Sequence, residues 1–226
     1  MPAYLDHAAT TPLRPEAAAA MLPWLTERFG NPSGSHAVAR AARAAIDDAR
    51  ELAAAALGVD PGGVVFTGGG TDADNLAILG RLGRRPGAVV CTAIEHHAVL
   101  HAAQAAAAGS GAATEWRVVP VHPDGTIDLD ALAGALDATV SVVSVMLVNN
   151  EIGTIQPLGP VARLVRRLAP QAVLHTDAVQ AFGWLDLVRH AAEADLISIS
   201  AHKFGGPQGT GVLAVRGDQR LAVHRN

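Results

Sequence analysis

Short apolar runs of strand length alternate along this chain with segments of helix-forming composition. Strands that are apolar throughout and separated by helices are typical of a parallel sheet with helices over both faces. The sequence therefore predicts an α/β fold, a mostly parallel sheet covered by helices. The strand-length runs lie at residues 63–67, 88–92, 116–121, 140–148, 172–177, 195–200 and 211–216, and the plainest helical segments between them at 71–83, 98–108 and 158–169.

One long helix is expected before the first strand. Residues 35–58 are rich in alanine, arginine and leucine, which favour a helix. Ser35 is a plausible N-cap and Gly58 a C-terminal stop. No internal repeat and no linker divides the chain, so its 226 residues fit one large domain.

Composition excludes several classes of protein. The net charge is −4 and aromatic residues make up 4%, so no basic or base-stacking surface for nucleic acid is expected. No run of ~18 apolar residues predicts a membrane span, and no secretory signal is visible at the N-terminus. The one cysteine, Cys91, has no partner for an internal disulfide, which fits a reducing compartment such as the cytoplasm.

Lys203 is the only lysine in a chain with 17 basic residues. It follows the apolar run at 195–200 and precedes a glycine cluster, as a residue does where a strand opens into a tight loop. Arginine can carry a surface charge equally well, but it does not deprotonate and cannot act as an amine nucleophile. A GC-rich coding sequence also disfavours lysine. The alternatives at this point are chance and amine chemistry, such as a Schiff base with a carbonyl cofactor.

Two strand ends open into helices with polar residues, at the edge where ligands bind in open α/β sheets. Residues 68–70 are glycines, and a helix start near Thr71 would present free N–H groups to an anion, although such a turn is also common for structural reasons. The run at 88–92 leads to His96, which either stacks on a planar ligand or only begins a helix. His97 and His101 have the spacing of half a zinc site, a weak signal without a third ligand, and no metal is expected.

Two further strand ends carry amides and carboxylates. Asn149, Asn150 and Glu151 follow the run at 140–148, where they either form a turn or contact a ligand. Asp177 ends the run at 172–177 and is either a helix N-cap or the partner of a cation. Gln180 lies three residues later. Together the four ends and Lys203 fit pyridoxal 5'-phosphate, which needs an anion site, a stacking ring, an acid at its ring nitrogen and an amine.

Seven stretches resemble the cysteine desulfurase family within the class V aminotransferase-like enzymes, in order and spacing. They are "YLDHAATTPLRPEA", "GNPSGSHAVARAARAAIDDARE", "FTGGGTDADNLAI", "EHHAVL", "VNNEIGTIQPL", "HTDAVQAFG" and "SAHKFGGPQGTGVL". The resemblance implies the large domain of a fold type I pyridoxal phosphate enzyme, a homodimer, and conversion of L-cysteine to L-alanine. It also implies an enzyme-bound persulfide for iron–sulfur cluster or thio-cofactor synthesis, passed to a sulfur acceptor or scaffold protein.

The resemblance also implies roles for individual residues. Lys203 resembles the lysine that binds the cofactor covalently and later moves protons. Gly70 and Thr71 resemble the phosphate contacts, and Ser200 and His202 add to them.

Four other positions match the cofactor ring and substrate contacts of the family. His96 resembles the histidine that stacks on the ring, and Asp177 the partner of its nitrogen. Gln180 resembles the donor to the ring hydroxyl, and Asn150 a contact to cofactor or substrate.

Family members are longer than this chain, so we expect residues 1–226 to be an incomplete cofactor-binding domain. From the resemblance, we expect the C-terminal small domain and the loop with the catalytic cysteine to be absent from it. Cys91 is expected to be a buried structural thiol rather than a substitute for that cysteine. A selenocysteine lyase, another aminotransferase-like enzyme, or a non-catalytic scaffold of the same fold remain alternatives.

Overall fold

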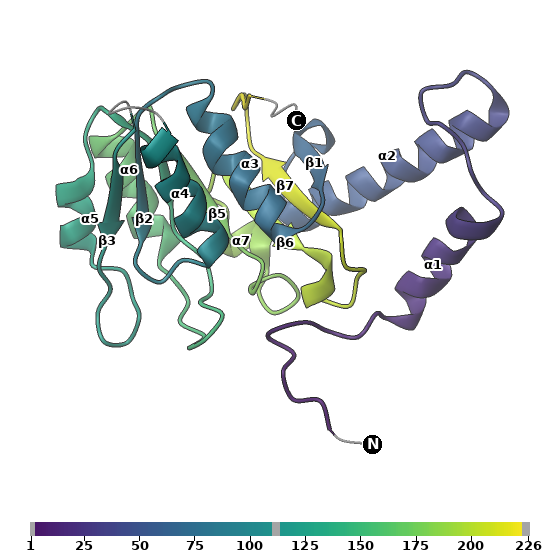
Figure 1. The fold of residues 1–226 in the computed structure, drawn as a ribbon, viewed down its shortest axis with the longest axis horizontal. Coiled ribbons are helices and arrows are strands. Elements are labelled where there is room, and N and C mark those ends of the chain that lie inside the picture. The colour runs from purple at the N-terminus through teal and green to yellow at the C-terminus, as the bar shows by residue number, and fades with distance from the viewer. Residues whose placement is uncertain (1–2, 110–113, 223–226) are drawn as a thin grey trace.

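The chain folds around one seven-stranded sheet, as the computed structural model shows for residues 3–109 and 114–222 (Figure 1). The strands lie in the order β1-β7-β6-β5-β4-β2-β3. The pairs β2–β3, β2–β4, β4–β5 and β5–β6 are parallel, whereas β7 is antiparallel to both β1 and β6. The predicted mostly parallel α/β sheet is therefore confirmed. The strands are β1 (Val64–Thr67), β2 (Ala88–Thr92), β3 (Trp116–Val119), β4 (Val140–Ser144), β5 (Val173–Asp177), β6 (Leu196–Ser200) and β7 (Gly211–Val215).

Helices cover both faces of the sheet, and each face has its own apolar cluster. On one face α3 (Gly70–Leu82) and α4 (His97–Gly109) pack on residues such as Val89, Cys91 and Leu213. On the other face α5 (Leu129–Ala135), α6 (Leu158–Leu168) and α7 (Leu187–His190) contribute to a larger cluster. Every residue of β2, β4, β5 and β6 is buried, which explains why these strands are apolar without alternation.

The long N-terminal helix begins differently from the prediction. Helix α2 runs over Ala37–Leu57, and the side chain of His36 accepts the N–H of Ala39, so His36 rather than Ser35 is the N-cap. The prediction of Ser35 was wrong because an imidazole nitrogen can fill the same acceptor role. Gly58 ends the helix as predicted, with a left-handed φ of 65° that suits glycine.

Two strands are shorter than their apolar runs. Strand β3 ends at Val119 and β4 at Ser144. Beyond β4 the N–H groups of Val145 and Leu147 still bond to carbonyls of His175 and Asp177. The apolar run continues because this segment remains buried beside β5, although it has left regular strand geometry.

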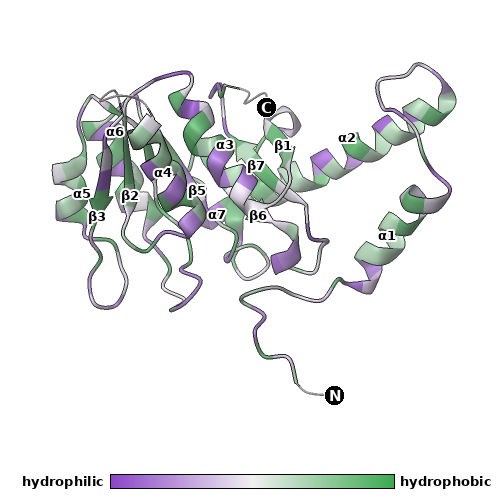
Figure 2. Cartoon of the chain, in the orientation of Figure 1, coloured by the Kyte–Doolittle hydropathy of each residue, from purple (hydrophilic) through white to green (hydrophobic). Residues whose placement is uncertain are grey.

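Helix α1 (Pro15–Thr26) and the outer part of α2 extend away from the sheet (Figure 1). Figure 2 shows mainly hydrophobic residues along α1, although that helix has no buried residue. Leu25 and Phe29 are 73% and 79% exposed. In the described part of the chain, no helix combines the length and apolarity that a membrane crossing needs.

Candidate active site

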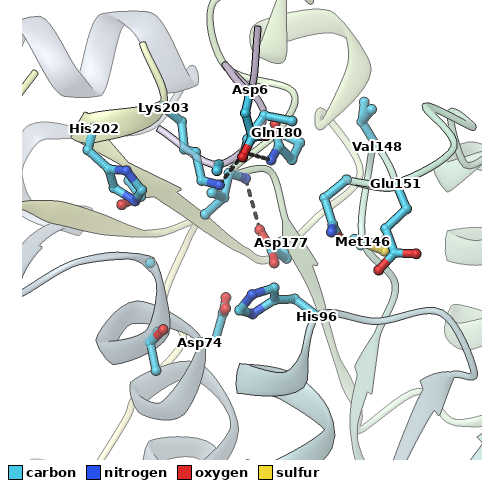
Figure 3. A pocket seen from close by; sticks show the side chains of 17 residues that line it. Asp6, Asp74, His96, Met146, Val148, Glu151, Asp177, Gln180, His202 and Lys203 are labelled. Carbon is cyan, nitrogen blue, oxygen red and sulfur yellow. Dashed lines mark hydrogen bonds between the residues drawn. The ribbon is translucent and has the colours of Figure 1, made fainter. Parts of the chain in front are cut away.

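The nine residues to which the resemblance assigns a role all line one pocket of about 550 Å³ at the carboxyl ends of β4, β5 and β6. This is the edge at which ligands bind in open α/β sheets. Figure 3 shows Lys203, Gln180, Asp177 and His96 around this space. The nine residues are Gly70, Thr71, His96, Asn150, Asp177, Gln180, Ser200, His202 and Lys203. The structure brings them together, while their roles toward a cofactor remain predictions.

Lys203 is the last residue of a short 3-10 turn, η2 (Ala201–Lys203), that follows β6. Its Nζ donates a hydrogen bond of 2.5 Å to the carbonyl oxygen of Ala8. Partial burial lowers the pKa of the Lys203 amine, and the charges of Asp177 and Asp6 oppose that shift. A lysine in such surroundings gives up its proton more easily than one on the surface, as an amine nucleophile must.

Asp177 is the last residue of β5 and only 5% exposed. Its Oδ1 accepts the N–H of Val179 at 2.8 Å, so the carboxyl organises the turn after the strand. The helix N-cap alternative was wrong, because the next helix begins only at Leu187. Burial raises the pKa of Asp177, whereas that hydrogen bond and the charges of His96 and Lys203 lower it. The carboxyl lines the pocket as well, where a cationic ligand atom would stabilise its charged form.

The glycine turn before α3 has the features of an anion site. Gly69 has a φ of 146°, a conformation that side chains disfavour. A Cβ at Gly70 would lie 2.8 Å from Cγ2 of Val179 and 3.2 Å from Cβ of Ser200, so any larger residue would force a neighbour to shift. The first-turn N–H groups of Gly70 and Thr71 have no partner among the described residues, and they point the positive end of α3 at the pocket.

The two asparagines after β4 have different surroundings. Asn149 is buried, and its Oδ1 accepts the N–H groups of Glu151 and Ile152 while its Nδ2 donates to Ile94. Asn149 therefore forms the turn, one of the two alternatives for this strand end. Asn150 and Glu151 line the pocket, where their side chains can contact a ligand.

His96 lies directly before α4, and its Nδ1 accepts the N–H of Ala98 at 3.2 Å. This bond fixes the ring at the pocket edge. His97 and His101 follow on α4 with ring centroids 5.4 Å apart. In residues 3–109 and 114–222 no group of three or more histidine, cysteine or carboxyl side chains has the arrangement of a metal site.

The N-terminal segment lines one side of the pocket, a contribution that residue patterns alone missed. Ala8 accepts hydrogen bonds from both Lys203 and Gln180, the latter at 2.7 Å. Thr11 donates from its N–H and its hydroxyl to the carbonyl of His202, each at 2.8 Å. The stretch "YLDHAATTPLRPEA" was quoted only for its resemblance. A run of small and hydroxyl residues carries no chemical signal by itself. Its role becomes visible only when the structure places it against His202 and Lys203, almost 200 residues later in the chain.

Comparison with known proteins agrees with this geometry. The sequence profile described as "Aminotransferase class-V" matches residues 3–224. The chain belongs to this family, whose enzymes depend on pyridoxal 5'-phosphate.

Curated proteins that are similar to this chain are named cysteine desulfurases. "Cysteine desulfurase IscS" of Methanosarcina thermophila is 41% identical over 94% of this chain and 52% of its own length. "IscS-like cysteine desulfurase" of Mycobacterium tuberculosis is 42% identical over 96% of this chain and 56% of its own length. The chain spans about half the length of the curated relatives it matches.

Solved structures have the same fold. A structure named "NIFS-LIKE PROTEIN" superposes with a TM-score of 0.91 at 32% identity, over 100% of this chain and 62% of that one. "SspA in complex with cysteine" superposes with a TM-score of 0.88 at 33% identity, over 97% of this chain and 63% of that one. The predicted resemblance and fold class are confirmed.

The residues present fit the cofactor of this family. The glycine cradle has donors for a phosphate, and Asp177 is a buried carboxyl with a place for a cationic ring nitrogen. An amine, Lys203, opens onto the same pocket.

Cys91 lies in β2 and is 1% exposed. Its sulfur accepts the indole N–H of Trp116 at 3.1 Å, and burial raises the pKa of the thiol to about 12. The expected buried thiol is confirmed, and Cys91 is neither accessible nor ionised enough to attack a substrate.

Proposed function

We propose that this chain is the cofactor-binding domain of a cysteine desulfurase, which releases sulfur from L-cysteine with formation of L-alanine. The observation that carries the proposal is the pocket itself, where the only lysine of the chain lies across from the buried carboxyl Asp177. The relatives named as cysteine desulfurases support the substrate, as does the solved neighbour whose name states a complex with cysteine.

The pocket residues divide by the part of the cofactor that they would hold. Gly70 and Thr71, with Ser200 and His202 beside them, would hold the phosphate at the positive end of α3. Lys203 supplies the amine for the aldehyde carbon.

The ring would be held by the remaining predicted residues. Asp177 would face the ring nitrogen and His96 would stack on the ring. Gln180 would donate to the ring hydroxyl, and Asn150 would contact the cofactor or the substrate. Bound pyridoxal phosphate supplies an electron sink for the electrons left on the substrate Cα.

The chain's own residues would handle the protons of the reaction. The pKa of the Lys203 amine is lowered by burial, so Nζ can take up a proton from the substrate and return it. The segment of Ala8 to Thr11 is hydrogen-bonded to Lys203 and His202, which holds it beside the amine. Gln180 shares the carbonyl of Ala8 with Lys203, which holds both side chains on the same side of the pocket.

The sulfur-accepting thiol must come from elsewhere, because Cys91 is the only cysteine in this sequence and is buried. We therefore assign residues 1–226 to one cofactor-binding domain, which acts together with a further segment that brings the catalytic thiol. The chain's match to about half of each relative supports this division.

A homodimer and a sulfur-accepting or scaffold partner complete the proposal. The exposed apolar side chains of α1 and the residues after it, including Leu22, Leu25 and Phe29, support burial of this arm against another surface. The single cysteine of the sequence supports a cytoplasmic location for the protein. The name of the relatives supports a role in iron–sulfur cluster assembly.

Cofactor titration separates the enzyme proposal from a scaffold of the same fold. The purified chain should develop the visible absorbance of lysine-bound pyridoxal phosphate, and Lys203→Ala should abolish it. L-cysteine and L-selenocysteine, added separately with a thiol donor, then distinguish a desulfurase from a selenocysteine lyase by the rate of alanine formation. A chain that folds but develops no absorbance would leave only the scaffold.

A further inference from the structure

A set of four buried polar side chains lies behind the pocket, on elements far apart in the sequence. Asp74 on α3 lies 3.5 Å from Nε2 of His175 on β5, measured from Oδ1. Nδ1 of His175 lies 2.8 Å from the hydroxyl of Ser144 on β4, which donates at 3.3 Å to Oε2 of Glu95. We call Asp74, His175, Ser144 and Glu95 the buried quartet. None of them entered the predicted site, although Asp74 lines the same pocket (Figure 3).

Asp74 is the member of the quartet whose bonding is incomplete. It is 1% exposed, and Oδ1 has no hydrogen-bond partner. Across the described ranges, His175 is the only basic side chain with a nitrogen within 4.0 Å of this carboxyl. A charged carboxylate needs donors or a cation when it is buried. Besides His175, the hydroxyl of Ser198 favours the charged form of Asp74, but a single hydroxyl that is shared with His175 supplies no cation.

His175 is poorly suited to be that cation. Its ring is completely buried, and each nitrogen faces a serine hydroxyl, Ser144 at 2.8 Å and Ser198 at 2.9 Å. Hydroxyls satisfy a neutral imidazole in either tautomer, because they both donate and accept. Burial lowers the pKa of His175 to about 3, so the ring is neutral near pH 7.

The other charges around Asp74 also oppose its ionisation. Burial raises its pKa well above the usual value and the charge of Asp177 raises it further, although a hydrogen bond with Ser198 lowers it. Lys203 and His96 act on Asp177 rather than on Asp74. Of two neighbouring carboxyls in one pocket, Asp177 is thus the one that can ionise, because the cations of the site face it.

We propose that Asp74 is a positioning residue that keeps its proton when Asp177 ionises, so that the floor of the pocket carries a single negative charge. A neutral Asp74 needs no cationic partner, and Nε2 of His175 is left to accept from the hydroxyl of Ser198. Nδ1–H of His175 donates to Ser144, and the Ser144 hydroxyl donates to Glu95. The charge seen by a cationic ring nitrogen would be that of Asp177 alone.

The test uses Asp74→Asn, which imitates a protonated aspartate in shape, with Asp48→Asn on the exposed face of α2 as the control. Infrared spectra of the chain without cofactor should lose one protonated-carboxyl band in Asp74→Asn and none in Asp48→Asn. The stability of the unmodified chain should fall with rising pH above the usual carboxyl pKa, because the folded state holds a proton that the unfolded state releases. Asp74→Asn should reduce this proton difference by up to one.

If Asp74→Asn does not fold, a measurement on the unmodified chain still tests the proposal. The ¹⁵N shifts of the His175 ring at pH 7 should be those of a neutral imidazole. Shifts of an imidazolium, or an unchanged set of carboxyl bands in Asp74→Asn, would overturn the proposal, since Asp74 would then be ionised.

The role of Asp74 in the pocket rests on the proposed cofactor site. Measurements of cofactor binding test this role. Affinity for pyridoxal phosphate at pH 7 should change by less than about threefold in Asp74→Asn, whereas loss of a charged partner in Asp177→Asn should weaken it by ~10-fold or more. A loss in Asp74→Asn as large as in Asp177→Asn would contradict a neutral Asp74. If the unmodified chain binds no cofactor, the proposed function fails, while the infrared and ¹⁵N results still decide the charge of Asp74.

Discussion

Replacing Gly70 by alanine tests the anion cradle at the atom where it is tightest. The added Cβ would lie 2.8 Å from Cγ2 of Val179 and 3.2 Å from Cβ of Ser200. Both neighbours are short side chains on buried or partly buried backbone, so they cannot swing away as a long surface chain would. Overpacking of this kind costs about 1–3 kcal/mol.

Alanine also favours the helix, which offsets part of that cost. The gain over glycine is at most ~1 kcal/mol inside a helix and smaller at a first-turn position such as Gly70. We therefore expect Gly70→Ala to lower the free energy of unfolding by about 1 kcal/mol once both effects are combined. The same methyl group occupies space beside the first-turn N–H groups, so the affinity for pyridoxal phosphate should fall by ~10-fold or more.

Gly134→Ala is the matched control. Gly134 is also helical, in α5, and a Cβ there would meet nothing within 4 Å. Urea unfolding should show this variant to be as stable as the unmodified chain or up to ~1 kcal/mol more stable. Cofactor titration should show unchanged affinity. If Gly70→Ala matched Gly134→Ala in both measurements, the argument from the cradle would be refuted.

Three further predictions follow from buried groups. Alkylation of Cys91 at pH 8 should be slower in the folded chain than in denaturant by at least roughly 10³-fold, because a thiol pKa of about 12 leaves so little thiolate; rapid labelling of the folded chain would show that Cys91 is accessible. Burial raises the pKa of Glu95 to about 8, so its contribution to stability is complete below pH ~4.5 and is lost as the pH rises toward 8. Glu95→Gln should remove that part of the pH dependence in urea unfolding, and an unchanged profile would contradict the assignment. Asp177→Asn should still attach the cofactor at Lys203, but Cα proton exchange of a bound amino acid should slow at least ~10-fold, and an unchanged exchange rate would contradict the role of Asp177.

The strands and most helices could be predicted because their signal is local. Buried parallel strands must be apolar throughout, and β2, β5 and β6 appear in the sequence almost at their observed limits. Helix α1 was missed because its apolar residues face away from the sheet and follow no core-facing pattern.

The candidate site was predictable where chemistry follows a strand end. Lys203 and Asp177 lie at such positions, and so does the glycine turn before α3. Asp74 and His175 lack that signal, because one lies inside a helix and the other inside a strand, and only their meeting in space makes them notable. Ala8 could not be predicted either, because it contacts Lys203 through its backbone carbonyl, which every residue has.

Borohydride reduction of the chain with pyridoxal phosphate, followed by peptide mapping, tests the central claim most directly. The claim is that this pocket presents Lys203 to the cofactor's aldehyde. We predict a stable pyridoxyl group on the peptide that contains Lys203, since it is the only side-chain amine in the sequence. An adduct found solely on the N-terminal amine, or none at all in the folded chain, would contradict the account.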